Sequence, residues 1–223
     1  MDFETLKAVE NEAERTAATY ELFNEETRLN RSKAARVEFF TTVRAIESTL
    51  LPGARILDIG AGAGEYSLHF ARLGYDVTAV ELAPVNVEAF RKKITPELRL
   101  TLLQGNALDL SVFPDGRFDV VLLMGPLYHL LSAADQDRAI AEARRVRSPD
   151  GTMFFSFISN DMVILTELAC RPHFFSENTY DHESFQVENF PFVFFTLDQM
   201  RNILLRNGVA ILREIASDGV SEL

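Results

Sequence analysis

The chain has little of several features that define whole classes of protein. Its 223 residues include a single cysteine, Cys170, which excludes an internal disulfide and an all-cysteine metal site. No apolar run approaches the roughly 20 residues that a membrane-spanning helix needs. The first 17 residues are acidic and lack the apolar core of a secretion signal. These absences favour a soluble protein of the reducing cytoplasm.

Positive charge is also scarce. The 22 lysines and arginines face 33 aspartates and glutamates, so the formal net charge is −11. Nucleic-acid binding draws most of its affinity from basic side chains that neutralise phosphates. DNA or tRNA is therefore disfavoured as a substrate, and we expect a small-molecule partner and no membrane association. The sequence leaves both a monomer and a homodimer open.

From residue 55 onward, strand-like and helix-like segments alternate along the chain. Six apolar segments have the composition of strands: Arg55–Ile59, Asp76–Val80, Leu98–Leu103, Phe118–Met124, Thr152–Ile158 and Val209–Ile215. Helical patterns lie between them: Glu65–Leu73, Pro84–Ile94, the segment from a Ser132 cap to Val146, and Thr196–Asn207. This alternation predicts an α/β fold with a Rossmann-like, doubly wound, mostly parallel sheet.

Two further segments flank this pattern. Residues 1–50 carry apolar positions at three- and four-residue spacing, which predicts a helical cap. Residues 161–195 are rich in aromatic side chains, and long irregular segments of this kind often serve as lids or binding loops. Because no repeat or linker interrupts the chain, we expect a single domain over 1–223. It would contain the cap, a cofactor-binding core over 51–160, a substrate-covering insertion over 161–195, and a C-terminal helix and strand over 196–223.

The segment with the clearest chemical signal is Ile56–Gly64, which reads ILDIGAGAG. A buried strand there runs into three glycines at alternate positions. Glycine allows a sharp turn and lets a ligand approach the backbone amides closely. A glycine loop alone is weak evidence, but its G-x-G-x-G spacing differs from the dinucleotide fingerprint G-x-G-x-x-G. No Lys-Ser/Thr pair follows, so a phosphate-binding P-loop is excluded.

Glu81 strengthens this interpretation. It ends the second predicted strand, 21 positions after Gly60. An acid about 20 residues beyond the glycine loop can accept hydrogen bonds from both ribose hydroxyls of a nucleotide-like cofactor. An isolated acid at a strand end is more often simply solvated, but the glycine loop at the right distance makes that alternative weaker.

With these residues in view, the chain resembles a known family. Residues 56–82 (ILDIGAGAGEYSLHFARLGYDVTAVEL) look like the first two motifs of the class I S-adenosylmethionine-dependent methyltransferases. GNALDL (105–110) and FDVVLLMGPLYHL (118–130) look like the third and fourth motifs. The phrase GPLYHL resembles bacterial small-molecule methyltransferases of the ubiquinone/menaquinone C-methylase-like type.

The resemblance implies S-adenosylmethionine as cofactor, S-adenosylhomocysteine as product, and no metal. Gly60, Ala61, Gly62 and Gly64 would wrap the methionine and ribose of the cofactor. Asp58 would lie near its ammonium group and Glu81 would bind its ribose. Residues near the ends of the later strands would complete the cofactor site: Leu82, Asn106, Ala107, Met124, Gly125 and Leu127.

The N-terminal cap offers further candidates. By the same resemblance, Arg28 or Arg31 would meet the cofactor carboxylate through a bidentate contact. Tyr20 and Tyr66 could present aromatic faces to the sulfonium. Core packing and solvent exposure are the commoner fates of such residues.

Tyr128 and His129 are the leading catalytic candidates because they follow the fourth strand, where ligands of open α/β sheets bind. His129 could act as a general base, or it could only position the ligand; the sequence favours neither. Methyl transfer by in-line displacement depends mainly on alignment of the reactants. His173 and His182 lack the spacing of a metal site.

The C-terminus departs from the family pattern. The family has two antiparallel strands after the last helix, and this chain offers only Val209–Ile215. We therefore expect the last antiparallel strand to be missing, and unpaired strand edges invite association. We interpret the chain as a truncated form, as a fragment, or as one that a partner chain completes.

The sequence thus predicts an S-adenosylmethionine-dependent methyltransferase (EC 2.1.1.-) acting on a small molecule. One alternative is an inactive module that binds S-adenosylmethionine or S-adenosylhomocysteine. A second, an NAD-dependent oxidoreductase, is disfavoured by the glycine spacing. The acceptor and the atom that is methylated stay open.

Overall fold

The computed structural model describes residues 3–23, 25–176, 179–188 and 190–217. Its central feature is one sheet of five parallel strands in the order β3-β2-β1-β4-β5. The strands are β1 (Arg55–Ile59), β2 (Asp76–Glu81), β3 (Leu100–Gln104), β4 (Phe118–Leu123) and β5 (Arg147–Phe155). The predicted α/β fold with a doubly wound parallel sheet is confirmed. Within the described residues, no helix is long and apolar enough to cross a membrane.

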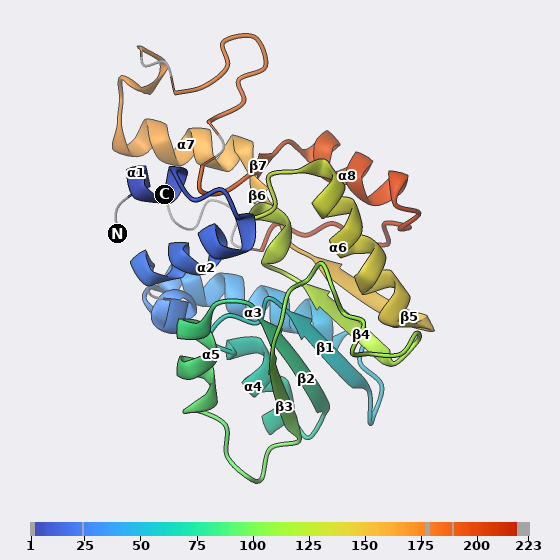
Figure 1. The fold of residues 1–223 in the computed structure, drawn as a ribbon. Helices are drawn as coiled ribbons and strands as arrows, with labels where there is room; N and C mark the ends of the chain where they lie inside the picture. Colours follow the sequence, from blue (N-terminus) through green and yellow to red (C-terminus); the bar gives the residue numbers. More distant parts are fainter. Residues whose placement is uncertain (1–2, 24, 177–178, 189, 218–223) are drawn as a thin grey trace.

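Helices cover both faces of the sheet (Figure 1). One face packs against α3 (Lys33–Glu47) and α4 (Glu65–Arg72), with α5 (Pro84–Arg91) beside them, and the other against α6 (Ala133–Val146) and α8 (Leu197–Arg206). Side chains of a strand alternate between its two faces. In β1, Ile56 therefore joins the cluster under α3 and α4, while Leu57 and Ile59 join the cluster under α6. Burial on both sides explains why β4 is almost wholly apolar and why Ile56, Leu57 and Ile59 of β1 are apolar too.

Polar residues fix where several helices begin. The Ser132 side chain accepts a hydrogen bond from the Asp135 amide at 3.1 Å, so the predicted cap of α6 is confirmed. Ser32 caps α3 in the same way, through the Ala35 amide at 3.0 Å. At the start of α8, Thr196 and Gln199 form a reciprocal capping box.

The first fifty residues are helical, as predicted, but they form four short pieces. These are α1 (Phe3–Lys7), α2 (Glu12–Leu22), a 3₁₀ turn η1 (Glu25–Asn30) and α3. Only α3 contributes to a cluster of the sheet core. The breaks let α2 and η1 lie over the ends of the strands, near α5, where a cap on the site has to lie.

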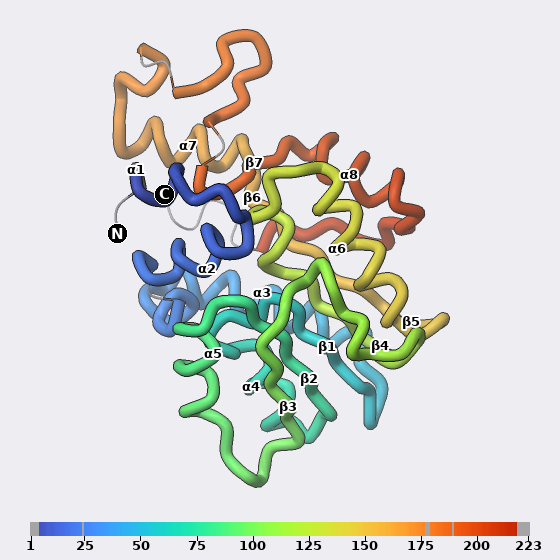
Figure 2. The backbone as a smooth tube through the Cα atoms, viewed as in Figure 1, coloured from blue at the N-terminus to red at the C-terminus, as the bar shows by residue number. Residues whose placement is uncertain are grey.

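Residues 161–195 are more ordered than their sequence indicates. They include most of α7 (Asn160–Cys170) and the turn η3 (Phe174–Ser176). A two-residue strand, β6 (Ile158–Ser159), pairs in parallel with β7 (Phe194–Phe195). Residues 179–188 extend away from the main sheet at the top of Figure 2. Most of this segment therefore lies outside the layers that form the core.

The predicted start of the fifth strand, Thr152, is wrong. β5 already begins at Arg147, directly after α6, and the register with β4 shifts between Phe118 and Val120. Residues 148–151 bulge out at this shift. Nη1 of Arg147 donates to the carbonyls of Pro149 and Gly151, both at 2.8 Å, and holds the bulge in place. The Pro-Asp-Gly sequence therefore marks a bulge within the strand rather than a turn before it.

The predicted sixth strand, Val209–Ile215, is also wrong. In the described part of the chain these residues pair with no strand. Val209 is buried, but Leu212 is 85% exposed and Ile215 is 41% exposed. Val209 and the partly buried Ile211 pack against the core, but the apolar side chains beyond them are exposed, and the segment pairs with no described strand that could stabilise it as one.

Candidate functional site

The candidate site lies where β1 and β4 end side by side. The strand order reverses at this pair, because β1 continues toward β2 and β3 while β4 leads to β5. Ligands of open α/β sheets bind at such a switch point, outside the carboxyl ends of the strands. The two ends touch: a Cβ on Gly60 would stand 2.7 Å from Cδ of Pro126. The residues after β1 and after β4 therefore form one surface.

We call the residues after β1 and β2 the glycine-loop site; its members are Asp58, the loop Gly60–Gly64 and Glu81. Gly64 has a φ of 86°, in the left-handed region, and a Cβ there would stand 2.3 Å from the ring of Phe90. No other residue fits without movement. Gly62 has a φ of 56°, and a Cβ on it would meet Cγ of Glu25 at 3.0 Å. The N-terminal cap thus lies directly on the loop.

Glu81 is the central carboxylate of the glycine-loop site, and it is only 4% exposed. Its Oε2 accepts from the Gly62 amide at 2.7 Å, and its Oε1 accepts from the Ala83 amide at 2.9 Å and from Asn86 Nδ2 at 3.3 Å. Burial raises the pKa of Glu81, and these hydrogen bonds oppose the rise. The sequence predicted that Glu81 and the glycine loop bind the same cofactor, and the structure brings the two together.

Asp58 lies on the α4 side of β1 and is also buried. Its Oδ2 accepts from Ser67 Oγ on α4 at 2.7 Å. Burial raises the pKa of Asp58 to about 6, against the effect of that hydrogen bond, and the nearby Glu81 adds to the rise. Two buried carboxylates therefore share this end of the site.

The backbone amides of the loop are already engaged. The Gly60 and Ala61 amides donate to the Val80 carbonyl at 2.8 and 3.1 Å, and the Gly62 amide donates to Glu81. The Gly64 amide donates to the Ala61 carbonyl at 3.0 Å. The loop therefore offers a ligand close approach to its backbone, rather than unpaired amide donors at these four residues.

Arg28, one of the two predicted arginines, lies between two acids of the cap. Its Nε donates to Glu25 at 2.8 Å, and its Nη1 donates to both carboxylate oxygens of Glu38 at 2.9 Å. Burial disfavours its charge, but Glu25 and Glu38 outweigh that effect and raise its pKa. Arg31 is exposed, and none of the described residues is recorded as its partner. The structure therefore brings Arg28 to the glycine loop, through Glu25, and leaves Arg31 at the surface.

The remaining predicted cofactor residues lie around the same strand ends. Asn106 uses its Oδ1 to accept from the Leu108 amide at 2.9 Å, which forms the turn after β3. Ala107 is buried beside it, and Leu82 is half-buried after β2. Tyr66 stacks on Phe39 of α3 with ring centroids 5.3 Å apart, and burial raises its pKa. Tyr66 thus packs between α4 and α3.

On the β4 side, the 3₁₀ turn η2 (Pro126–Tyr128) follows Gly125 and carries the two catalytic candidates. Met124 and Gly125 end the strand, and Leu127 is fully buried. Tyr128 is half-buried, with its hydroxyl 3.5 Å from the Met124 carbonyl. The turn points these side chains toward α2.

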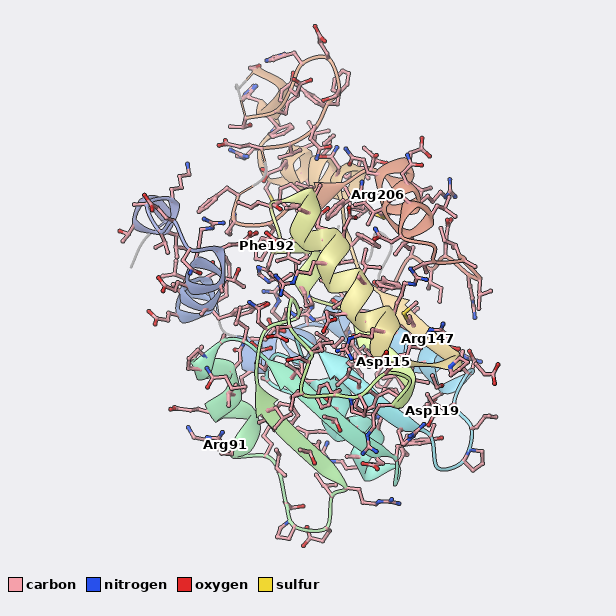
Figure 3. The ribbon with its side chains drawn as sticks, turned by 45° about the vertical axis from the view of Figure 1, so that its right-hand side comes forward. Arg91, Asp115, Asp119, Arg147, Phe192 and Arg206 are labelled. Carbon is pink, nitrogen blue, oxygen red and sulfur yellow. The ribbon has the colours of Figure 1, made fainter. Side chains whose placement is uncertain are left out.

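His129 is the centre of a group of rings that we call the aromatic cluster. Its members are Tyr20, Phe23, Tyr128, His129 and Phe192. Tyr20 Oη lies 2.8 Å from His129 Nε2. The rings of Tyr128 and Phe192 each lie 5.1 Å from the His129 ring, and Phe23 lies 5.7 Å from Phe192. Figure 3 shows Phe192 between the N-terminal helices and α6.

The aromatic cluster is uncharged at neutral pH. Burial lowers the pKa of His129 to about 4. Burial raises the pKa of Tyr128 to about 12, and it also raises that of Tyr20, with Tyr128 and Glu25 adding to the effect. All three polar rings of the cluster therefore stay neutral.

Sequence reasoning missed several residues that build the site. Ser67, Asn86 and Glu25 hold the polar groups of the glycine-loop site, and Phe192 completes the aromatic cluster. Phe192 stands out within residues 161–195, because Phe174, Phe175, Tyr180 and Phe185 pack on one another instead. The aromatic richness of that segment signalled a cluster, but not which ring reaches the site.

His173 and His182 form no metal site within the described residues, where no group of three or more His, Cys, Asp or Glu side chains could hold an ion.

Comparison with known proteins agrees with this geometry. Residues 57–155 match the family described as "Methyltransferase domain". A ubiquinone biosynthesis O-methyltransferase of Xanthomonas campestris pv. campestris is 36% identical over 110 residues, which is 49% of this chain and 45% of that protein. The match spans about half the length of that relative.

Two solved structures share the fold. A protein from Pyrococcus horikoshii has a TM-score of 0.63 at 21% identity and covers 85% of this chain and 88% of its own. A structure of SAM-dependent methyltransferases from Methanosarcina mazei has a TM-score of 0.57 at 21% identity and covers 73% and 82%. The matched residues 57–155 contain the glycine loop, Glu81 and His129. Residues 57–155 are thus similar to the methyltransferase domain family, and the structure shares the fold of these two solved proteins.

Proposed function

We propose that the protein transfers a methyl group from S-adenosylmethionine to a small-molecule acceptor by in-line displacement. The observation that carries the proposal is the position of Glu81. A carboxylate that is 4% exposed stands against a loop in which Gly60 and Gly64 leave no room for a Cβ, next to the switch point of the sheet.

The residues of the glycine-loop site fit a cofactor of this kind. Glu81 accepts three recorded hydrogen bonds, and a carboxylate can accept about four, so it can take a further one from a ribose hydroxyl. Asp58 and Arg28 supply a carboxylate and a guanidinium for the zwitterionic methionine end of the cofactor. Leu82, Asn106 and Ala107 would border the adenine. The bound cofactor would supply an activated methyl group.

The aromatic cluster would hold the acceptor. Tyr128 and His129 follow β4, beside the strand that leads into the glycine loop, so a ligand between them would face the cofactor. The rings of the cluster carry no charge and suit a flat apolar molecule. The name of the Xanthomonas relative, an O-methyltransferase, supports the oxygen of a hydroxyl group as the atom that is methylated.

Calorimetry with S-adenosylmethionine, S-adenosylhomocysteine and NAD tests the cofactor. We expect saturable binding of the first two and none of NAD. Glu81→Ala should weaken binding by roughly 1.5–3 kcal/mol, the typical contribution of a hydrogen bond to a charged group. Glu88→Ala is the matched control, because Glu88 is an exposed acid on the neighbouring helix α5. Binding of NAD alone, or equal affinities in the two variants, would contradict the proposal.

The alternative function is a module that binds the cofactor without turnover. Release of S-adenosylhomocysteine in the presence of phenolic and aliphatic hydroxyl compounds separates the two. Cofactor binding without any release across such a panel favours the inactive module.

A further inference from the structure

The contact between Tyr20 and His129 joins two parts of the chain that are 109 residues apart. Tyr20 lies on α2 of the N-terminal cap, and His129 follows η2 at the end of β4. Tyr20 Oη and His129 Nε2 are 2.8 Å apart, which is a full hydrogen bond. One of the two ring nitrogens of His129 is therefore already used by the protein.

The direction of this hydrogen bond decides which nitrogen carries the proton. A neutral imidazole has one N–H and one bare nitrogen, whereas a phenolic hydroxyl can donate or accept. A bare imidazole nitrogen takes up a proton with a pKa of about 6.5, whereas the neutral hydroxyl oxygen of a phenol is protonated only in strong acid, so the nitrogen is much the stronger acceptor. The Tyr20 hydroxyl therefore donates to Nε2, and the proton of His129 resides on Nδ1.

Nδ1 of His129 is the ring nitrogen that the contact with Tyr20 leaves unused. In the described part of the chain, the buried side-chain polar atoms without a hydrogen-bond partner are Arg147 Nε and Thr179 Oγ1. Nδ1 of His129 is not one of them, and none of the described residues is recorded as bonded to it. His129 is buried, with 6% of its surface exposed, and Nδ1 is the ring nitrogen left for a ligand.

We propose that His129 positions the methyl acceptor as a hydrogen-bond donor, through Nδ1–H, and that Tyr20 fixes the tautomer that makes this possible. His129 then does not remove the proton of the acceptor, because its bare nitrogen points at Tyr20. This assignment rests on the proposed function only for the identity of the ligand. The sequence left two roles open for His129, a general base or a positioning residue, and the proposal assigns the second.

The same geometry defines the acceptor that fits. The Tyr128 and Phe192 rings lie 5.1 Å from the imidazole, and no charged side chain belongs to the aromatic cluster. The acceptor that suits this surface is a flat ring with an oxygen that accepts a hydrogen bond from Nδ1–H. The lowered pKa of His129, about 4, keeps the ring neutral at pH 7, so that Nε2 stays bare and can accept from Tyr20.

Nuclear magnetic resonance tests the tautomer without any acceptor. In ¹⁵N-labelled protein at pH 7, long-range ¹⁵N–¹H spectra distinguish a protonated ring nitrogen from a bare one. The four histidines are assigned by the signal that is lost in His129→Asn. We expect Nδ1 to be protonated and Nε2 to be bare in the unsubstituted protein.

Tyr20→Phe should shift His129 toward the tautomer with Nε2 protonated. Tyr180→Phe is the matched control, because Tyr180 also hydrogen-bonds through its hydroxyl, to the Phe175 carbonyl, but lies in a separate group of rings. A protonated Nε2 in the unsubstituted protein would overturn the proposal. So would a tautomer that Tyr20→Phe leaves unchanged in a folded protein.

Kinetics with an active acceptor separate a donor from a base. An asparagine amide can replace Nδ1–H as a donor but cannot act as a base, so His129→Asn should keep about five- to tenfold more activity than His129→Ala. Equal activities would overturn the donor role. Calorimetry on the same variants measures cofactor binding separately. If the cofactor does not bind, the proposed function is wrong. The tautomer measured by NMR does not depend on that outcome.

Discussion

The glycine-loop site and the aromatic cluster lie next to each other but treat polar groups in opposite ways. The first concentrates charge: Asp58 and Glu81 are buried carboxylates that backbone amides and short side chains hold in place. The second excludes charge: Tyr20 and His129 satisfy each other among aromatic rings. The residues of the first come from β1, β2 and their nearby helices, whereas those of the second come from α2, η2 and the segment before β7.

The two parts of the site also differ in how far they fall within the range that matches the family. The polar groups of the glycine-loop site lie within residues 57–155, which match the methyltransferase domain family. Tyr20, Phe23 and Phe192 lie outside that range. Under the proposed function, the cofactor would be held within the matched range, and the acceptor would be selected partly by residues outside it. The predictions below test this division.

The largest expected effect concerns Gly64. Gly64→Ala places a Cβ 2.3 Å from the Phe90 ring in a left-handed backbone conformation, so strain and overpacking combine to a loss of about 2–5 kcal/mol. Gly74→Ala is the control, because its φ of 90° is similar but nothing lies within 4 Å of the added atom; it should cost only about 1–2 kcal/mol. Urea denaturation measures both. Equal losses would show that the loop is not tightly packed on α5.

The two parts of the site should respond to pH with opposite signs. The pKa of Asp58 is raised to about 6, so folded protein keeps a proton that unfolded protein releases, and this contribution to stability falls as pH rises from about 4 to 6. The pKa of His129 is lowered to about 4, so unfolded protein binds the proton more tightly, and stability rises with pH over a similar window.

Asp58→Asn and His129→Asn separate these contributions. Asp58→Asn should make the free energy of unfolding rise more, or fall less, between pH 4 and 7. His129→Asn should do the reverse, each by about 2–3 kcal/mol. Denaturant titrations at several pH values measure the slopes. Changes of the same sign in both variants would remove the electrostatic contrast between the two parts.

A moderate effect is expected at Phe192. Phe192→Ala removes ring contacts to Phe23, Tyr128 and His129, but Phe192 is only half-buried, so the loss should be about 1–2 kcal/mol. The fully buried Phe70 provides the comparison: Phe70→Ala should cost about 3–5 kcal/mol. Cofactor affinity should stay unchanged in Phe192→Ala, as calorimetry can show. A large drop in that affinity would mean that the two parts of the site are not separable.

The smallest effect separates the two arginines of the cap. Arg31→Ala should change stability by no more than about 0.5 kcal/mol and leave cofactor affinity unchanged, since Arg31 is exposed. Arg28→Ala leaves Glu25 and Glu38 without their shared partner and should weaken cofactor binding. If Arg31→Ala weakens binding more than Arg28→Ala, the cap is oriented differently when the cofactor is bound.

The same division explains what the sequence could predict. Signals that act over a few residues were sufficient for β1, the glycine loop and the Ser132 cap. Glu81 was also within reach, because its distance from the loop is set by a single helix and strand. These features depend on local backbone conformation and on the alternation of strand and helix.

The failures share a cause as well. The Val209–Ile215 segment has the alternation of a strand, but a strand forms only where a neighbouring edge and a covered face are available. The partner of His129 lies 109 residues away, and Phe192 is one of several aromatic residues in its segment with the same local pattern. Such pairings are set by how the cap and the later segments fold back, which a local pattern does not contain.

The contact between Gly60 and Pro126 has a consequence for how this protein can change over evolutionary time. Because the ends of β1 and β4 are pressed together without room for a side chain, neither can shift relative to the other. If the aromatic cluster holds the acceptor, as proposed, drift toward a new acceptor is easier by replacement of the surrounding cap and of the segment before β7. A laboratory that wishes to redirect the enzyme can do the same, by grafting residues 1–32 and 160–195 from relatives onto an untouched sheet.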